Sequence, residues 1–353
     1  MSRNKVKVGI IGLGAIGSVH ADAYHVSPDA EITVVCDISD ARLAEIGNKY
    51  NVKQRLKDYR DLLKTDIDAV SICVGNVLHR EVAVAALKAG KHILLEKPMA
   101  MNAREAAEIT AAGKKAKKVI QIGMMWRHSQ QAMVIRDYIQ KGLFGDIYHL
   151  RTVMIRRRGI PGLGGWFTTK SASGGGPLID LGVHWFDVAM HISGLWKPTQ
   201  VSAMNYAKFG KDMRNYRYIS MWAGPPNYNG TCDVEDYSVG LVRFGKKASM
   251  AFEIAWAANM EGTQSIDILG SKGGARLLCG GPMSIFTEHN GQIVNMSPLI
   301  NDSSNKYHRQ ADIFIKACRG ECPPAATAEE GLTVMKLIDA VYASGKSGRE
   351  VTI

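Results

Sequence analysis

The 353-residue sequence lacks any apolar run of the roughly 18–20 residues that a membrane-spanning helix needs. Residues 1–8 lead straight into a strand-like pattern, so we expect no secretory signal and a cytoplasmic protein. Cysteine is scarce, and the six that occur include no C-x-x-C pair and no His or Cys partner set for zinc. These absences argue against a membrane protein and predict reduced thiols and no metal.

Acidic residues are outnumbered by basic ones, which gives a net charge of +11. The basic residues are scattered, for example over residues 114–118 at the end of a predicted helix. We interpret them as a solvated surface whose positive potential suits an anionic dinucleotide. No recognition module for nucleic acid is visible, so we expect no nucleic-acid partner, and weak binding that vanishes with salt would reflect charge alone.

Strand-like and helix-like segments alternate in the first third of the chain. Helical patterns separate five apolar, β-branched runs, at residues 5–11, 31–36, 68–74, 93–95 and 119–124. This alternation predicts an α/β fold with a doubly wound parallel sheet, the Rossmann arrangement, over residues 1–125.

The rest of the chain follows a different pattern. Strand candidates come one after another without intervening helices, at residues 199–206, 238–244, 248–255, 263–269 and 276–278. Consecutive strands predict an α+β domain with an antiparallel sheet over residues 126–353. Helical patterns within about residues 308–345 are expected to dock back on the first domain.

Gly12, Gly14 and Gly17 form a G-x-G-x-x-G motif between the first strand and the first helix. Glycine permits a tight turn there and lets backbone N–H groups approach a pyrophosphate at the helix N-terminus. Asp37 ends the next strand, where a carboxylate accepts hydrogen bonds from ribose hydroxyls and repels a 2′-phosphate. The motif therefore predicts a dinucleotide, with NAD preferred over NADP; Arg42 is the residue that would favour NADP.

A lysine follows the fourth strand in the segment Glu96-Lys97-Pro98. Open α/β sheets bind ligands at this carboxyl end, and proline biases Lys97 away from helical geometry. A lysine near a nicotinamide can polarise a substrate oxygen or move its proton. The alternative is a structural salt bridge to Glu96.

A helix is predicted after Pro177, which suits a first helical turn. Asp180, His184, Asp187 and His191 recur at helical spacing and are expected to share one face. His184 is the predicted general base for a hydroxyl, and Asp180 is predicted to orient the substrate or the imidazole. A metal-binding face and a plain solvated face are the alternatives, and His191 is expected to be structural.

Taken together, these features resemble the family of glucose–fructose oxidoreductase, inositol dehydrogenase and rhizopine-catabolism proteins (Gfo/Idh/MocA). The resemblance covers nearly the whole chain, in the family's order: the glycine turn, Asp37, and residues 76–79, 89–98, 174–187, 329–331, 342–344 and 348–351. Two departures occur. Residues 73–76 replace the usual Thr-Pro-Asn, and residues 156–166 are unusually basic.

The resemblance implies an N-terminal dinucleotide-binding domain and a C-terminal domain on a large open, mostly antiparallel sheet, whose exposed face commonly forms a dimer or tetramer interface. It implies Lys97, Asp180 and His184 as the catalytic group. The residues expected to line the cofactor are Gly12, Gly14, Ala15, Ile16, Asp37, Val74, Gly75, Asn76, His79, Glu96, Lys97 and Trp166. Those expected to contact the substrate are Lys97, Arg127, Arg158, Asp180, His184 and Tyr237.

Typical substrates of the family are sugars, sugar derivatives and cyclitols. The glycine-rich approach to Asp180 looks more like the family's sugar oxidoreductases than its inositol dehydrogenases. We therefore expect NAD-dependent oxidation of a secondary hydroxyl on a pyranose or glycoside, with Lys97 and His184 handling the proton. Two alternatives stay open: a redox-neutral enzyme that modifies or cleaves a sugar with retained NAD, and a non-catalytic sugar or dinucleotide sensor. The three catalytic candidates argue against the sensor, because binding alone needs no proton-transfer group.

Overall fold

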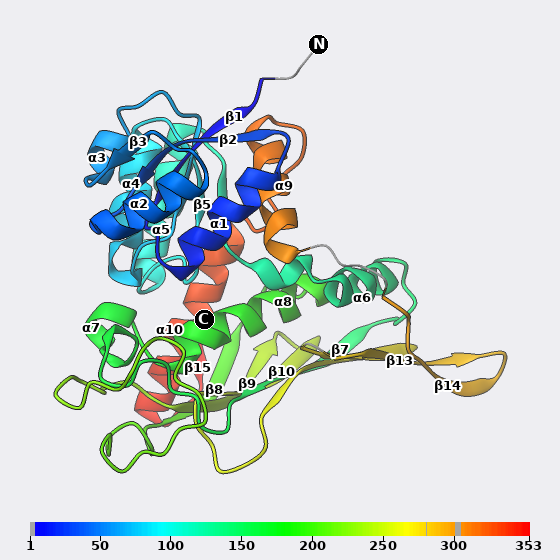
Figure 1. The fold of residues 1–353 in the computed structure, drawn as a ribbon. Helices are drawn as coiled ribbons and strands as arrows, with labels where there is room; N and C mark the ends of the chain where they lie inside the picture. The colour runs from blue at the N-terminus through cyan, green and yellow to red at the C-terminus, as the bar shows by residue number, and fades with distance from the viewer. Residues whose placement is uncertain (1–3, 280, 301–304) are drawn as a thin grey trace. The chain divides into compact units, whose positions relative to one another are not determined.

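The computed structural model describes residues 4–279, 281–300 and 305–353, which fall into two compact units. The first unit contains residues 4–128 and 305–332, and the second contains residues 129–279, 281–300 and 333–353. No helix within these ranges is long and apolar enough to cross a membrane. Figure 1 labels many of the elements of both units.

A six-stranded parallel sheet forms the centre of the first unit. Its order is β3-β2-β1-β4-β5-β6. The strands are β1 (Val6–Ile11), β2 (Ala30–Cys36), β3 (Gln54–Leu56), β4 (Ala69–Ile72), β5 (His92–Leu95) and β6 (Ile120–Ile122). The strand order reverses between β1 and β4. The carboxyl ends of these two strands therefore form the switch point at which open α/β sheets bind ligands.

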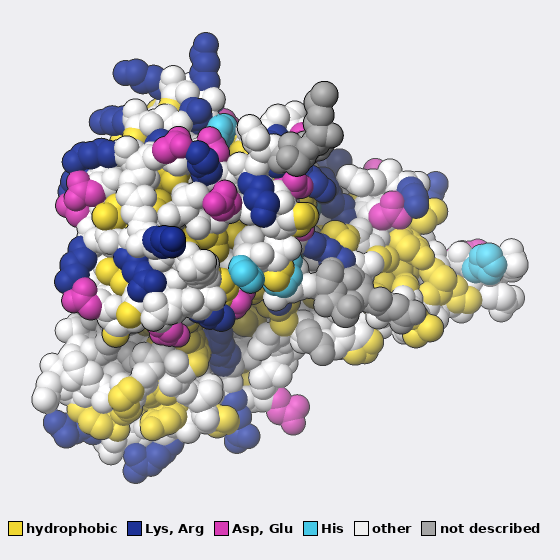
Figure 2. Space-filling model, turned by 45° about the horizontal axis from the view of Figure 1, so that its top comes forward, with side chains coloured by type: hydrophobic (Ala, Val, Ile, Leu, Met, Phe, Trp, Pro, Cys, Tyr) yellow, Lys and Arg dark blue, Asp and Glu magenta, His cyan; other side chains and the backbone are white. Residues whose placement is uncertain are grey.

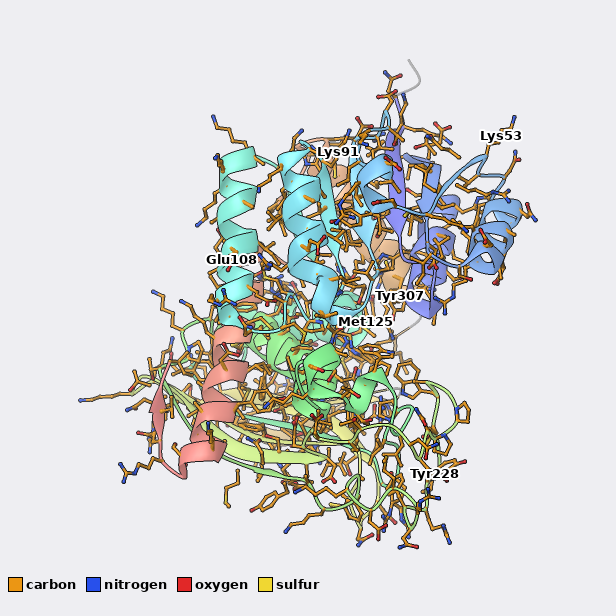
Figure 3. All side chains as sticks on the ribbon, turned by 90° about the vertical axis from the view of Figure 1, so that its left-hand side faces the viewer. Lys53, Lys91, Glu108, Met125, Tyr228 and Tyr307 are labelled. Carbon is orange, nitrogen blue, oxygen red and sulfur yellow. The ribbon has the colours of Figure 1, made fainter. Side chains whose placement is uncertain are left out.

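The helices of this unit come from both ends of the chain. They are α1 (Ala15–Val26), α2 (Asp40–Lys49), α3 (Tyr59–Leu62), α4 (His79–Lys88), α5 (Ala103–Ala116) and α9 (Lys306–Cys318), with the 3-10 helices η1 (Asn76–Leu78) and η2 (Met125–His128). On α9, Phe314 and Ile315 share a buried core cluster with Val8 and Ile10 of β1, and Tyr307 packs against it (Figure 3). The late helix α9 is thus part of the dinucleotide-type unit.

A nine-stranded sheet forms the second unit, in the order β14-β13-β12-β11-β7-β10-β9-β8-β15. Its strands are β7 (Ile147–Ile155), β8 (Gln200–Tyr206), β9 (Tyr237–Phe244), β10 (Ala248–Ala255), β11 (Thr263–Gly270), β12 (Gly273–Leu278), β13 (Met283–His289), β14 (Gln292–Met296) and β15 (Val351–Thr352). β7 and β10 pair in parallel, and the other neighbours are antiparallel. The parallel sheet of the first unit and this mostly antiparallel sheet confirm the predicted fold class.

Helices cover one face of the second sheet. They include α6 (Gln130–Gln140), α8 (Val183–Ser193) and α10 (Ala328–Ser347), while the short helices α7 (Lys170–Ser173) and η3 (Trp166–Thr168) contact each other between β7 and α8. Phe186 of α8 meets Phe252 of β10 edge to face, with ring centroids 5.0 Å apart. On the opposite side, which we call the open face, alternate residues such as Met204 and Leu241 are exposed.

The β13–β14 hairpin was not predicted, although its signal is present in the sequence. Asn290 and Gly291 join the two strands with φ values of 50° and 71°. Asn-Gly is the strongest short-range hairpin signal, because both residues tolerate positive φ. The flanking strands are largely exposed, so they lack the apolar alternation by which strands such as β9 and β10 were predicted.

Basic side chains do not gather into one stripe on the face seen in Figure 2. Lys and Arg are interspersed there with Asp and Glu. This distribution agrees with the interpretation of the net charge as a solvated surface.

Candidate active site

The glycine turn between β1 and α1 is too tight for side chains at two positions. Gly12 has a φ of 87°, and a Cβ there would lie 2.5 Å from the carbonyl oxygen of Cys73. A Cβ on Gly17 would collide with the carbonyl oxygen of Gly12. Gly14 is the N-cap of α1 and offers its first N–H groups no side-chain acceptor. The turn therefore fits a pyrophosphate bound at the start of α1.

Asp37 is held in place beside this turn. Its carboxylate accepts hydrogen bonds from the N–H of Leu13 at 2.7 Å and from the N–H of Ser39 at 2.8 Å. The exposed guanidinium of Arg42 lies 3.8 Å from the same carboxylate. Each carboxylate oxygen can accept a second hydrogen bond. Asp37 can therefore keep these bonds and still accept from ribose hydroxyls.

Five other predicted cofactor residues of this unit lie in the segments that follow the carboxyl ends of β1 and β4. Ala15 and Ile16 form the first turn of α1, while Val74, Gly75 and Asn76 follow the end of β4. A Cβ on Gly75 would meet no atom within 4 Å, so its surroundings leave space next to the backbone. The two loops follow β1 and β4, the strands that flank the switch point.

His79 braces the loop after β4, whereas we predicted that it lines the cofactor. The side chain is only 1% exposed. Its Nδ1 lies 2.6 Å from the carbonyl oxygen of Pro98, and its Nε2 lies 3.1 Å from that of Val74. Burial lowers the pKa of His79. Because both ring nitrogens face backbone carbonyls, this histidine links the cofactor loop to the segment after Lys97.

Lys97 follows β5, as predicted, and is half-buried. The neighbouring carboxylate of Glu96 is buried and accepts a hydrogen bond from the backbone N–H of Lys97 at 3.2 Å. The other oxygen of Glu96 lies 3.0 Å from Nε2 of His20 on α1. Glu96 therefore fixes the main chain at the catalytic candidate and forms a buried pair with a residue that we did not predict.

The His20–Glu96 pair is part of a buried polar cluster between α1, β4 and β5. Nδ1 of His20 lies 2.6 Å from Oγ of Ser71 and 3.5 Å from Sγ of Cys73. Burial alone would lower the pKa of His20, but Cys73 and Glu96 outweigh it and raise the pKa to about 10. The raised pKa favours the imidazolium form of His20 beside the carboxylate of Glu96. Its position three residues after Gly17 was the only signal in the sequence.

In the second unit, Asp180 lies in the π-helical turn η4 (Leu178–Gly182), directly before α8. Nε1 of Trp256 donates a hydrogen bond to Oδ2 of Asp180 at 3.0 Å. His184 lies one turn later and is 8% exposed. π-turns are rare and often occur at functional sites. The segment that contains Asp180 is thus a π-turn, and His184 follows at the start of α8.

The two later residues of the predicted stripe lie further along α8. Asp187 is buried, and Nε2 of His191 accepts a hydrogen bond from Nη1 of Arg136 on α6 at 3.1 Å. His191 thus joins α8 to α6, in keeping with the structural role expected for it.

Two predicted binding residues lie in the loops of the second unit, where Tyr228 is labelled in Figure 3. The guanidinium of Arg158 lies 4.3 Å from the ring centroid of Phe209, and its Nη2 donates to Asn259 at 2.5 Å. Trp166 is exposed and stacks on Phe167, with centroids 3.8 Å apart. Both residues remain predictions as ligand contacts.

Two other predicted substrate residues have side-chain partners within their own units. Arg127 is 3% exposed, and its Nη1 donates to the carbonyl oxygen of Ala325 at 2.6 Å and to Glu330 at 2.8 Å. Arg127 therefore binds the segment 325–330 within the first unit. Tyr237 lies on the open face, opposite to the face covered by α8, and its hydroxyl donates to Glu253 at 2.9 Å. Both residues stay predictions as substrate contacts.

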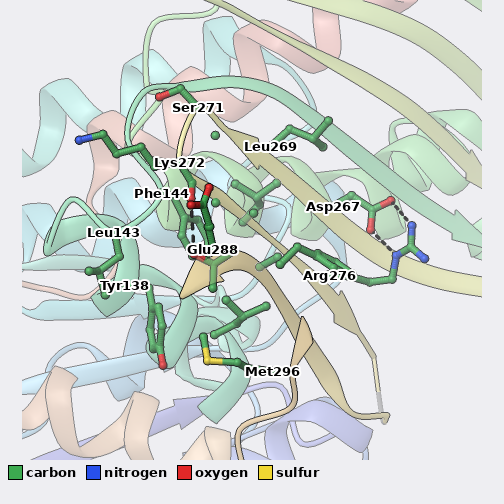
Figure 4. A pocket seen from close by; sticks show the side chains of 18 of the residues that line it. Tyr138, Leu143, Phe144, Asp267, Leu269, Ser271, Lys272, Arg276, Glu288 and Met296 are labelled. Atoms are coloured by element: carbon green, nitrogen blue, oxygen red, sulfur yellow. Dashed lines mark hydrogen bonds and ion pairs between the residues drawn. The ribbon is translucent and has the colours of Figure 1, made fainter. Parts of the chain in front are cut away.

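A hollow of about 1270 Å³ lies at the far end of the second sheet, between β11–β14 and the loop after α6 (Figure 4). An ion pair between Arg276 and Asp267 forms part of its wall, with Nε and Oδ1 2.6 Å apart. None of the predicted site residues is among the described residues that line it. Its size alone therefore does not identify the active site.

The parallel sheet with its glycine turn and Asp37 defines a dinucleotide-binding protein. The chain belongs to the Gfo/Idh/MocA family: the model of the family's NAD-binding Rossmann domain matches residues 6–124, and the model of its C-terminal domain matches residues 133–276. The predicted family and the predicted cofactor, NAD, are thereby confirmed.

Known relatives align with the chain from end to end. It is 31% identical to D-glucoside 3-dehydrogenase of Escherichia coli, over 100% of this chain and 99% of that protein. It is 25% identical to myo-inositol 2-dehydrogenase of Thermotoga maritima, over 98% and 97% of the two chains. The solved complex of levoglucosan dehydrogenase with NADH has the same fold, with a TM-score of 0.86, 22% identity and 99% coverage of both chains.

Proposed function

We propose that this protein is an NAD-dependent dehydrogenase that transfers a hydride between the nicotinamide and a secondary hydroxyl of a sugar, glycoside or cyclitol. The observation that carries the proposal is the placement of Asp180 and His184. Both are nearly buried acid–base groups at one helix start, and Trp256 holds the carboxylate of Asp180. The chain thus combines proton-transfer groups with a dinucleotide-binding unit.

The first unit binds and orients the cofactor in this proposal. NAD accepts the hydride when it is bound. The turn at Gly12 admits the pyrophosphate to backbone N–H groups, and Asp37 accepts from the ribose hydroxyls. Lys97 donates a hydrogen bond to the substrate oxygen and stabilises the negative charge that develops there. The hydrogen bond between Glu96 and the N–H of Lys97 keeps this lysine at the end of β5.

The second unit moves the proton. His184 takes the hydroxyl proton as general base, and Asp180 orients the substrate or the imidazole. The substrate class is supported by the relatives, which include a glucoside dehydrogenase and an inositol dehydrogenase aligned over nearly their whole length. The identity to the glucoside enzyme is the higher, so we place glycosides first.

Incubation of the purified protein with NAD and a panel of glycosides, monosaccharides and inositols tests the proposal. A substrate-specific rise in the absorbance of reduced nicotinamide is expected. Lys97→Ala and His184→Ala should abolish turnover while NAD still binds, and His191→Ala on the same helix is the control. Near-normal rates in both variants would refute the proton-transfer roles.

The same assay separates the alternatives. Cofactor that stays bound through purification, combined with sugar conversion but no net reduction of NAD, would point to the redox-neutral enzyme. Sugar binding without any conversion would point to the sensor.

We further propose a cytoplasmic homodimer or homotetramer that uses the open face as its interface. Met204 and Leu241 are large apolar side chains exposed on this face, and burying them would be favourable. Light scattering is expected to give a mass of two or four chains, and Leu241→Lys should lower it. A monomer at micromolar concentration would refute this assembly.

A further inference from the structure

A carboxylate and a phenol hold the start of the π-turn in the second unit. Glu235 Oε1 accepts hydrogen bonds from the N–H groups of Gly176 at 3.1 Å and Leu178 at 3.2 Å. Gly176 also lies within hydrogen-bonding distance of Oε2, at 3.0 Å, and the hydroxyl of Tyr342 donates to Oε1 at 2.9 Å. The first N–H groups of a helix have no acceptor within it. Glu235 supplies that acceptor, with the charge that a helix start favours.

The glycine run before Asp180 is shaped around these two side chains. A Cβ on Gly175 would collide with the hydroxyl of Tyr342, and a Cβ on Gly176 would collide with the carbonyl oxygen of Glu235. Glycine at these positions therefore admits the carboxylate and the phenol to the turn. Burial raises the pKa of Glu235, and the backbone and Tyr342 donors act in the opposite direction.

Asp180 is connected to the same short segment by two routes. Its N–H donates to the carbonyl oxygen of Gly176 at 3.1 Å, and Gly176 is bound by Glu235. Its carboxylate accepts from the indole of Trp256, whose backbone N–H donates to the carbonyl oxygen of Asp236 at 3.0 Å. Hydrogen bonds therefore connect both the main chain and the side chain of Asp180 to residues 235–236. A shift of residues 235–236 would move the carboxylate of Asp180.

We propose that Glu235 and Tyr342 are positioning residues that fix Asp180, and through the same turn His184, for the reaction, an inference that rests on the function proposed above. Glu235 does so by binding the N–H groups of the turn, and Tyr342 by holding the carboxylate of Glu235. Neither residue contacts the substrate in this role.

Two measurements on the full chain test this role, with Glu235→Gln and Tyr342→Phe as the variants. Glu253→Gln is the matched control, because Glu253 accepts a tyrosine hydroxyl at the same distance of 2.9 Å on the open face of the same sheet. The first measurement is hydrogen exchange of the amides of residues 176–184. The second is a comparison of kcat, KM and the Kd for NAD, taken well below the melting temperature of each variant.

Glu235→Gln keeps the shape of the side chain but places an amide NH₂ against donors. We expect exchange over residues 176–184 to become at least tenfold faster and kcat to fall at least tenfold, with KM changed less than kcat and an unchanged Kd for NAD. Tyr342→Phe leaves the backbone bonds intact, so its kcat should fall by a smaller factor, about two- to fivefold. Glu253→Gln should change none of these values.

A Glu235→Gln variant that is folded and retains wild-type kcat would overturn the positioning role. If the wild-type protein shows no NAD-linked turnover, the proposed function fails. Hydrogen exchange alone then decides whether Glu235 holds the turn at residues 176–184. Exchange in residues 176–184 that matches the wild type would then overturn it, and faster exchange confined to this segment would support it.

Discussion

Replacing His20 by leucine should destabilise the first unit strongly, because it would remove the imidazole that pairs with the buried carboxylate of Glu96. His20 is 2% exposed and lies 3.0 Å from Glu96. Removing one member of a buried ion pair costs about 3–5 kcal/mol, most of which is the penalty of the remaining charge.

The pKa of His20 leads to a similar magnitude. Burial lowers this pKa, but Cys73 and Glu96 raise it from 6.5 to about 10. At about 1.4 kcal/mol for each tenfold change in proton affinity, this difference is worth on the order of 5 kcal/mol. Because the folded-state pKa is the higher one, the stabilisation is complete below pH 6.5 and is lost as the pH rises through about 10.

Thermal unfolding of the wild type and His20→Leu measures this loss. A change of 1 kcal/mol shifts the midpoint by about 2–4 °C for 150–250 residues, so we expect a decrease on the order of 10 °C at pH 7. The difference should shrink as the pH approaches 10. His25→Leu is the control, since His25 is exposed on the same helix and its replacement should change stability by less than about 0.5 kcal/mol.

A second variant separates the lost pair from a change in packing. His20→Leu/Glu96→Leu removes both charges, and the double change should recover much of the lost stability. If His20→Leu melts within 2 °C of the wild type (about 1 kcal/mol or less), or if the difference is the same at pH 7 and pH 10, His20 is not a buried imidazolium and the reasoning is wrong.

Three further predictions concern the cofactor turn and the open face. Asp37→Ala should lower kcat/KM for NAD about 10- to 100-fold and that for NADP less, because each charged hydrogen bond to the ribose is worth about 1.5–3 kcal/mol; equal losses would contradict the proposed NAD preference. Gly17→Ala should destabilise the protein by about 1–3 kcal/mol in denaturant titrations, because the new Cβ would collide with the carbonyl oxygen of Gly12. Gly14→Ala is the control and should not destabilise the protein, because the atom nearest to its new Cβ would lie 3.8 Å away. Equal unfolding midpoints for the two variants would count against the tight turn. Tyr237→Phe should leave kcat/KM within twofold of the wild type in steady-state assays, since its hydroxyl bonds to Glu253; a tenfold loss would support the substrate role first predicted for it.

Local patterns in the sequence were sufficient for five of the six strands of the parallel sheet, with β3 as the exception. The strands β1, β2, β4 and β5 are short apolar runs, and the glycine turn and Asp37 follow at set distances. These features depend on backbone period and on conformations that only glycine allows, which neighbouring residues determine. The same holds for the placement of Lys97 at the end of β5.

Side-chain partners distant in the sequence were decided by the tertiary structure. Glu96 meets His20 across 76 positions, and Glu235 meets Gly176 across 59. A glutamate has the same local pattern whether it binds a helix start, a histidine or water, so its neighbours in sequence do not reveal its partner.

The partners of two predicted substrate residues also depend on the tertiary structure. Arg127 and Tyr237 were chosen for their types and for their places near a predicted domain junction and strand start. Arg127 instead bonds to Glu330, 203 positions away, and the pleat of β9 turns Tyr237 to the open face. The sequence by itself determined the fold class, the cofactor turn and the chemical types of the site. The tertiary structure decided which charges are buried as pairs, which turn becomes a π-helix and which face each strand residue occupies, because these depend on packing between segments far apart in the chain.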